Sequence, residues 1–308
     1  MEKHNTSKRE TALNSLGGFI LRKLHKHTLY HYTTLSTFDA FLKDDAHLYC
    51  THYAALNDSS ELRCGLDVVC KHLQKENGIS FAVCSQLKEC FEEGCSREMI
   101  HPTWIMSFSL EKDSLYQWGM YTDRKQGGYS IGFDSAKLMN FVEESNERNG
   151  RTGNPTFTMK LMPCFYVKRN RKQIKTFLRQ VFDINDSSLA RLKKSGFKSA
   201  SAVVSVLARM VLVSCLIKHE SFKFENEVRL VIDPTSFDWT NVSLVGGKPR
   251  WNTGLFPHGK EQLRSVFKEV WISPHGDKQL LKNVAEIMKQ KHGLTFTIKA
   301  SKSPYNGR

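Results

Sequence analysis

The sequence predicts an α+β protein with a mixed, mostly antiparallel sheet, which could be split, flanked by helices and carrying a helical insertion. Segments such as Thr28–Thr33 and Thr103–Leu110 alternate and are rich in aromatic and β-branched residues, as strands are. Segments such as Thr34–Lys43 place apolar residues at helical spacing instead. The strands are scattered among the helices without a regular β-α-β order, which disfavours a doubly wound sheet.

The first half of the chain is expected to begin with a loose arm at residues 1–17, followed by a single domain over residues 18–308. Alternation predicts strands, and apolar residues at i, i+3 and i+4 behind a Ser, Thr or Asp cap predict helices. Strands are expected at 28–33, 46–51, 103–110 and 129–133, and helices at 34–43, 59–74, 80–95, 113–121 and 135–144. Asp113 is the expected cap of the helix at 113–121, and Asp134 or Ser135 that of the helix at 135–144.

The second half is expected to open with a strand at 156–167, followed by the helical insertion at about 168–219. A long β-like run at 222–232 is ended by Asp233-Pro234, because proline cannot donate to a sheet. The remaining expected elements are strands at 242–245, 268–272 and 294–299 and a helix at 277–291.

The charge balance favours acidic partners. Lys plus Arg number 45 and Asp plus Glu 31, a formal net charge of +14. Such a charge suits nucleic acid, nucleotides or an acidic protein, although a solubilising surface charge explains it equally well. The densest basic run predicts a nucleic-acid-binding surface at Lys168, Arg169, Arg171 and Lys172.

The cysteines and the hydropathy pattern point to the cytoplasm. None of the eight cysteines forms a C-x-x-C pair, so we expect reduced thiols and no metal, although a zinc site stays open because twelve histidines are present. The longest apolar segment, Ala200–Ile217, is interrupted by polar residues and is expected to be a buried helix. We therefore expect no membrane association.

Tyr30-His31-Tyr32 is the first candidate segment of a functional site. Alternation places Tyr30 and Tyr32 on one face of the strand and His31 on the other. A histidine at a strand end can donate to a ribose hydroxyl or a diphosphate, and the tyrosines can stack on a planar ring. A surface strand with one histidine is the alternative.

Ser107-Phe108-Ser109 and the helix that follows form the second segment. Ser107 and Ser109 share a strand face and suit hydrogen bonding to a sugar or an amide. Trp118 and Tyr121 lie three residues apart and so form one aromatic helix face. Core aromatics with satisfied hydroxyls are the alternative.

The third segment contains two carboxylates and a cation. On a strand, Glu225, Glu227 and Arg229 would share one face. A carboxylate there could stabilise a sugar cation or accept a proton. A surface Glu–Arg ladder is the alternative, and Glu61, a further candidate, is better explained by compensation of its helix dipole.

Short motifs follow one another in a fixed order along nearly the whole chain. They are Leu29-Tyr30-His31-Tyr32, Leu56-Asn57-Asp58 with Glu61, Ser107-Phe108-Ser109, Trp118 and Tyr121, Gly128 through Phe133-Asp134, Phe224-Glu225-x-Glu227-x-Arg229, and Ser303-Pro304-Tyr305 with Arg308. This order resembles a bacterial family, the domain of unknown function 2971. The second motif departs from the family's usual Phe-Asn-Asp-Pro-Phe-Glu, which weakens a specific role for that loop.

A second, fainter resemblance concerns activity. A first strand with histidine, a Ser-x-Ser strand and a Glu-x-Glu strand, in that order, look like the three motifs of ADP-ribosyltransferases. The resemblance implies that His31 holds the ribose of NAD, that Ser107 and Ser109 line its pocket, that Glu227 is catalytic and that Glu225 orients the acceptor. Tyr30, Tyr32, Trp118, Tyr121 and Arg229 would complete the NAD site.

The sequence thus leads to three hypotheses from different functional classes. The first is an ADP-ribosyltransferase-like enzyme that consumes NAD as a substrate and modifies a protein or nucleic acid, in phage defence or as a toxin. The second is a defence protein that binds or cleaves nucleic acid through the basic run. The third is a non-catalytic sensor or interaction module, in which Glu227 pairs with Arg229.

Overall fold

The computed structural model describes residues 24, 26–42, 48–56, 59–97, 103–151, 157–234, 242–245, 248–253 and 260–304. The chain divides into two compact units, each assembled from separated stretches of sequence. The first contains the described parts of 52–104 and 162–223, and the second those of 23–51, 105–161 and 224–308. The predicted α+β class with a mostly antiparallel sheet is confirmed.

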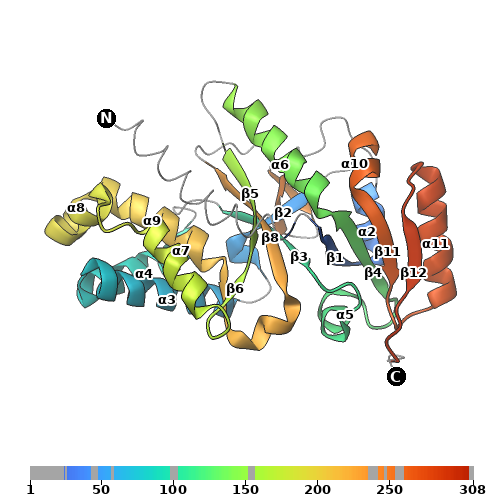
Figure 1. Cartoon of the computed structure of the whole chain (residues 1–308), viewed down its shortest axis with the longest axis horizontal. Helices are drawn as coiled ribbons and strands as arrows, with labels where there is room; N and C mark the ends of the chain where they lie inside the picture. The colour runs from blue at the N-terminus through green and yellow to red at the C-terminus, as the bar shows by residue number, and fades with distance from the viewer. Residues whose placement is uncertain are drawn as a thin grey trace. The chain divides into compact units, whose positions relative to one another are not determined.

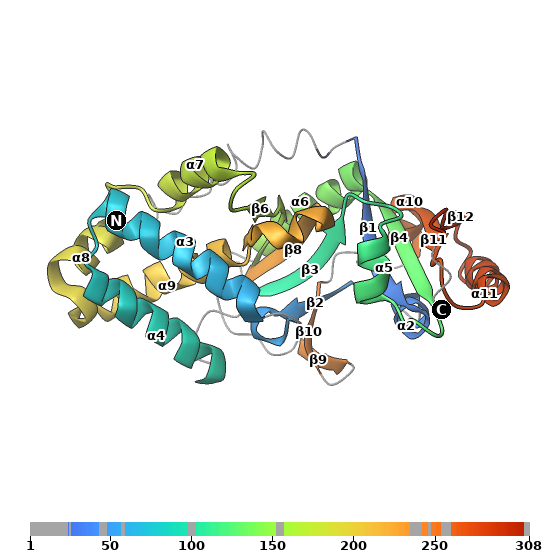
Figure 2. The same ribbon diagram turned by 90° about the horizontal axis from the view of Figure 1, so that it is seen from below.

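The first unit is mainly helical. Figures 1 and 2 show its helices gathered side by side: α3 (Ser59–Asn77), α4 (Phe81–Arg97), α7 (Arg171–Val181), α8 (Ser187–Ser195) and α9 (Ala200–Ser214). Short elements complete it: η1 (Tyr53–Ala55), β6 (Phe165–Tyr166), η2 (Gly196–Lys198) and β7 (Ile217–Lys218), with β6 and β7 paired in parallel.

Helix α9 is the buried helix that the sequence predicts. Its apolar side chains, such as Val206 and Met210, are fully buried. Gly65 on α3 allows the end of α9 to approach closely, because a Cβ there would collide with the backbone of Ser214. Arg209 of α9 also forms an ion pair with Asp186, the N-cap of α8, at 2.9 Å.

The second unit is built on an open sheet. Its strands are β1 (Thr28–Thr34), β2 (Tyr49–His52), β3 (Trp104–Ser109), β4 (Gly128–Asp134), β5 (Phe157–Pro163), β8 (Glu227–Pro234), β9 (Val242–Val245), β10 (Lys248–Asn252), β11 (Phe267–Ile272) and β12 (Thr297–Ala300). The order is β12-β11-β4-β1-β3-β2-β10-β9, and β8 pairs with β3 and β5. Strands β11 and β12 run parallel, whereas β1, β3, β4 and β11 pair antiparallel along the path.

The pairing register assigns side chains to the two faces of this sheet. Tyr30 lies opposite Ser109 on β3 and opposite Gly132 on β4. Because side chains alternate along a strand, Tyr30, Tyr32 and Ser109 share one face, which we call the aromatic face. The neighbouring residues, such as Phe108 and Phe133, lie on the opposite face, where their rings contact each other in the apolar core.

Helices cover both faces of the sheet. They are α2 (Leu35–Leu42), α5 (Leu115–Tyr121), α6 (Ser135–Gly150), α10 (Lys260–Val266) and α11 (Lys278–Lys291). Phe38 of α2 contacts Tyr129 and Phe296, so α2 covers the core face. Helix α5 lies against β1 in Figure 2 and contacts Tyr32, so it covers the aromatic face.

Two expectations from the sequence need correction, and two further elements were not expected. The run at 222–232 is not one strand: η3 (Glu220–Glu225) precedes β8, which begins at Glu227. The N-cap of α5 is Ser114 rather than Asp113, whereas Asp134 does cap α6 as expected. Strand β10 and helix α10 were not expected from the sequence at all.

Several other expectations stay predictions. The arm at 1–17, Asn57 and Asp58, and the C-terminal Tyr305 and Arg308 lie outside the described residues, as does the Glu61 side chain. The single domain over 18–308 and its insertion at about 168–219 are not tested by the two-unit division.

The thiols and the hydropathy of the helices complete the description. Seven cysteines are thiols in the described part of the chain, and no cluster of three or more metal-ligating side chains occurs there. No single described helix is long and apolar enough to cross a membrane. The segments Ser187–Lys198 and Ala200–Ser214 are long and apolar enough only when taken together, and the chain bends by 118° between them. Cytoplasmic location stays a prediction.

Candidate functional site

Five aromatic side chains form a cluster on the aromatic face. Tyr30, Tyr32, Trp118 and Trp271 are buried together, and Tyr121 packs against them. The rings of Tyr32 and Trp118 meet edge to face, with their centroids 4.7 Å apart. The tyrosines of the first motif and the tryptophan of α5, chosen from separate sequence segments, therefore lie in contact.

Glu269 on β11 binds the polar ends of two of these rings. Tyr30 Oη and Trp271 Nε1 donate to Glu269 Oε1 at 2.7 and 2.8 Å, and Lys299 Nζ lies 2.5 Å from Oε2. Burial alone would raise the pKa of Glu269, but the hydrogen bonds from Lys299, Trp271 and Tyr30 outweigh it and lower that pKa. Burial and the adjacent Glu269 raise the pKa of Tyr30.

Asp113 connects the cluster to the C-terminal segment. Its Oδ1 accepts from Trp118 Nε1 at 2.8 Å and from Ser301 Oγ at 2.6 Å, and its Oδ2 accepts from the Lys302 backbone at 2.8 Å. Asp113 is free for these contacts because the adjacent Ser114 caps the helix instead.

The second and third motifs also meet on this face. Ser109 Oγ donates to the Glu225 carbonyl at 2.6 Å across 116 residues of sequence. Tyr121 Oη donates to Glu225 Oε1 at 3.4 Å, and Gln117 Nε2 reaches the Glu225 carbonyl at the same distance. One contact network thus contains Tyr30, Tyr32, Ser109, Trp118, Tyr121 and Glu225, all of them chosen from the sequence.

Glu225 does not share a strand face with Glu227 and Arg229, contrary to expectation. It ends η3, and Asn226 has a positive φ of 41° before β8 begins. The chain therefore turns between the two glutamates, and strand alternation does not apply to Glu225. The Asn226 side chain donates to Glu111 Oε1 at 2.6 Å.

Glu227 and Arg229 form a buried ion pair. Arg229 Nε and Nη2 donate to the two oxygens of Glu227 at 2.6 and 3.1 Å, a bidentate geometry that fixes both groups. The side chains are only 5% and 4% exposed. The sequence expectation that Arg229 is the cation beside these carboxylates is thus met for Glu227.

His31 lies on the core face, away from the cluster. Its Nδ1 donates to the Ser107 carbonyl at 2.9 Å, and its ring meets Phe108 edge to face at 6.1 Å. Burial lowers the pKa of His31, as does the nearby Arg250, against the opposing effect of the Ser107 carbonyl. Since Ser107 pairs opposite Tyr32, its side chain and that of His31 point to different faces.

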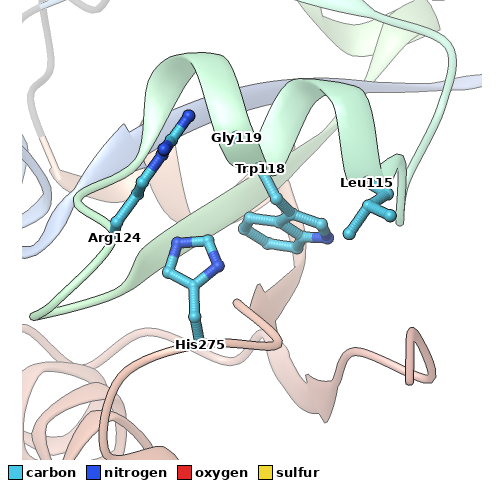
Figure 3. Close-up of a pocket in the computed structure, with 5 residues that line it drawn as sticks. All are labelled: Leu115, Trp118, Gly119, Arg124 and His275. Carbon is cyan, nitrogen blue, oxygen red and sulfur yellow. The ribbon is translucent and has the colours of Figure 1, made fainter. Parts of the chain in front are cut away.

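A cavity of about 200 Å³ lies beside α5. Figure 3 shows the residues that line it, which come from α5, from the turn after it and from the loop after β11: Leu115, Trp118, Gly119, Arg124 and His275. Trp118, predicted together with Tyr121 for an NAD site, lines this cavity, whereas Tyr121 is not among its lining residues, so the NAD site stays a prediction. Arg124 and His275 were missed, because no spacing pattern links residues so far apart.

Glu269, Trp271 and Asp113 were also missed. Glu269 and Trp271 stand two apart on a strand that the sequence predicts, so their shared face was available as a signal. The sequence predicted Asp113 as the N-cap of the helix, so its hydrogen bond with Trp118 was not considered.

The basic run lies in the first unit. Lys168, Arg169, Arg171 and Lys172 are exposed, and the last two open α7. The backbone N–H groups of Lys168 and Arg169 both donate to Glu220 Oε2 at 3.0 Å. Further along α7, Lys175 and Arg179 form ion pairs with Glu76 of α3, so part of the helix charge is compensated.

Comparison with known proteins yields one match. Residues 117–230 match a family model described as "Protein of unknown function (DUF2971)", in agreement with the resemblance seen in the sequence. No curated protein and no solved structure matches the chain.

Proposed function

We propose that this chain, whose residues 117–230 match the model of the family of unknown function DUF2971, is an NAD-consuming enzyme of the ADP-ribosyltransferase kind. One observation carries the proposal: the three motifs that resemble those enzymes lie on or beside neighbouring strands of one sheet. Strand β1 carries the first motif, its neighbour β3 the second, and β8, which pairs with β3, follows Glu225 and carries Glu227.

The network on the aromatic face supports a role in binding. Tyr30, Tyr32 and Ser109 lie on one sheet face, and Trp118 and Tyr121 of α5 pack over it. The rings of Tyr30, Tyr32 and Trp118 are buried, and their polar ends bind Glu269, the Glu111 carbonyl and Asp113. The partly buried Tyr121 is therefore the ring of this cluster that a ribose or a planar base would meet first. His31 has no part in the proposal, because its side chain lies on the core face.

The proposed reaction breaks the bond between the ribose C1′ of NAD and the nicotinamide nitrogen. Nicotinamide leaves with the bonding electrons, and the sugar carbon gains positive charge. The Glu227 carboxylate would stabilise that charge, and its ion pair with Arg229 holds it in one orientation. An acceptor nucleophile then bonds to C1′ and loses its proton, with Glu225 orienting the acceptor.

The test is incubation of the purified chain with NAD labelled in nicotinamide, with and without protein and nucleic-acid acceptors. We expect release of nicotinamide by the native chain, and loss of release in the double variant Glu227→Gln/Arg229→Gln, which removes both charges together. Induced expression in bacterial cells should deplete their NAD, as a toxin or defence enzyme would. A native chain that releases no nicotinamide with any acceptor would overturn the proposal.

A second candidate function is nucleic-acid binding by the basic run. The observation in its favour is the exposure of all four side chains, together with the absence of an acidic residue in the first turn of α7. Cations at a helix N-terminus oppose its dipole, so a bound polyanion would relieve this unfavourable arrangement.

A non-catalytic module is the third candidate, and the buried Glu227–Arg229 pair favours it. A bidentate pair so little exposed is also what a purely structural ion pair looks like. A catalytic pair and a purely structural pair predict different activities for a folded variant that lacks both charges.

A further inference from the structure

We propose that the cavity beside α5 is a binding site for a small planar aromatic carboxylate, separate from the glutamates of the proposed NAD reaction. The cavity and those glutamates use different sides of α5. Leu115, Trp118 and Gly119 line the cavity, whereas Gln117 and Tyr121 reach Glu225. On a helical wheel Leu115 and Gly119 point more than ~90° away from Gln117 and Tyr121, and Trp118 lies between the two groups, ~60° from Tyr121.

The size of the cavity fits a single substituted ring. Its volume is about 200 Å³, and a dry protein cavity of ~150 Å³ accommodates benzene. The additional volume suits one carboxylate. A whole dinucleotide requires considerably more room, since drug-sized ligands occupy about 300–1,000 Å³.

The walls offer apolar surface on one side and a cation on the other. Leu115, 48% exposed, and the ring of Trp118 supply the apolar surface of the cavity. Arg124 is exposed and lines the same space, and a guanidinium binds a carboxylate through two parallel hydrogen bonds. An aromatic anion therefore matches both sides.

His275 is held in one orientation at this site. Thr122 Oγ1 donates to the Trp118 carbonyl at 2.6 Å, so towards His275 it acts as an acceptor, and His275 Nε2 donates to it at 2.8 Å. Burial lowers the pKa of His275, and Arg124 also lowers it, against the opposing effects of the Asp123 backbone and carboxylate. A neutral imidazole adds no second cation, so Arg124 supplies the charge that selects an anion.

Two interlocked turns make the site rigid. Gly127 has a φ of 79° and Gly276 a φ of 82°, and a Cβ on either would lie about 2.6 Å from the backbone of the facing turn. Ser273 Oγ donates to the His275 carbonyl at 2.6 Å and accepts from Gly128 N at 3.0 Å. The loop that carries His275 is thus fixed before any ligand arrives, which lowers the entropy cost of binding.

The test measures binding of benzoate to the full chain by saturation-transfer NMR and calorimetry, with benzamide as the neutral ligand of matching shape. We expect saturable binding of benzoate with a Kd on the order of 1 mM, as a nine-atom ligand allows, and weaker binding of benzamide. Absence of saturable benzoate binding, or equal affinity for benzamide, would overturn the proposal.

Matched variants locate the site. A Cβ at Gly119 or at Gly150 would meet no described atom within 4 Å, so Gly119→Leu and Gly150→Leu should both fold. Only Gly119→Leu fills the cavity, and we expect it alone to abolish binding. Arg124→Gln should weaken binding about tenfold, and its exposed neighbour Lys125→Gln by less than about twofold. Undiminished benzoate binding by Gly119→Leu would place the ligand elsewhere and refute this assignment.

Neither outcome depends on the NAD reaction. Nicotinamide release without benzoate binding would contradict only the proposed carboxylate site. Benzoate binding without nicotinamide release would contradict only the proposed transferase activity. Each proposal can therefore be contradicted without affecting the other.

Discussion

Asn226 holds a backbone conformation that most side chains avoid, with a φ of 41°. Asparagine and glycine tolerate this left-handed region, whereas a Cβ without a polar group costs roughly 1–2 kcal/mol there. The residue turns the chain between Glu225 and Glu227 and so decides which groups each carboxylate meets.

For Asn226 we predict that Asn226→Ala is less stable than Asn226→Gly by about 1 kcal/mol. Both variants lose the hydrogen bond to Glu111, so the difference between them isolates the backbone strain. Urea denaturation of the two proteins measures it. Equal free energies of unfolding would show that position 226 relaxes without strain.

For Glu227 the structure changes what the sequence leads one to expect. The sequence alone predicts that Glu227→Gln leaves folding intact. In the structure, however, Glu227 is the buried partner of Arg229, so this substitution would leave the Arg229 charge buried without a counter-charge. We therefore predict a loss of about 3–5 kcal/mol in the free energy of unfolding for Glu227→Gln, and a smaller loss for Glu227→Gln/Arg229→Gln.

The double variant also separates catalysis from structure at these two residues. If Glu227 stabilises the sugar cation, the folded double variant should lose nicotinamide release by about 100-fold or more. A folded double variant that releases nicotinamide at the native rate would make the pair purely structural.

At the scale of elements, sequence periodicity locates most helices and strands. It fails where the backbone conformation is not reflected in the spacing of apolar residues. The β-like composition of Phe222–Ile232 conceals the turn at Asn226, because alternation carries no information about φ. Strand β10 pairs with β2 and β9. It is short and contains Pro249, so its sequence shows no alternation from which a strand could be predicted.

For the start of α7 we predict a salt-dependent affinity for duplex DNA. Neutralising Lys168, Arg169, Arg171 and Lys172 should weaken binding and reduce the log–log salt slope by ~0.9 per lost phosphate contact. Filter binding at several salt concentrations measures both. The matched control neutralises four exposed lysines of the second unit: Lys125, Lys278, Lys282 and Lys291.

Two results would contradict a docking role for α7. A native chain that does not bind DNA at low salt would leave the basic run as a solubilising surface. Equal loss of affinity in the control would show that net charge, rather than this helix, governs binding.

At the scale of the whole molecule, buried histidines link stability to pH. Burial lowers the pKa of His31, His72 and His275 below the usual 6.5, and it lowers that of His52 to about 4. The unfolded chain therefore binds more protons than the folded chain below about pH 6.5. Stability should fall as the pH drops from about 6.5 towards the folded pKa values.

We predict that the midpoint of urea denaturation is lower at pH 5.5 than at pH 7.5. The variants His52→Phe and His72→Phe should each flatten this dependence, because neither phenylalanine can be protonated. The exposed His27→Gln serves as the control and should leave the slope unchanged. A native chain equally stable at both pH values would contradict the linkage.

The candidate site shows how far sequence reasoning reaches across the molecule. Residue types and spacing identified Tyr30, Tyr32, Ser109, Trp118, Tyr121 and Glu225, which do meet. Alternation already places His31 on the face opposite Tyr30 and Tyr32, but spacing could not show that this is the core face, where its ring meets Phe108. Nor could it find His275, which reaches Thr122 across 153 residues.

The place of β4 in the sheet has a consequence for synthesis on the ribosome. One neighbour, β1, is made before β4, but the other, β11, begins only at Phe267. At about 5–20 residues per second, β4 waits on the order of 10 s with one edge unpaired. An unpaired strand edge of a nascent chain is a template for aggregation, so this protein is expected to depend on chaperones during translation and to gain yield from slower initiation or lower temperature.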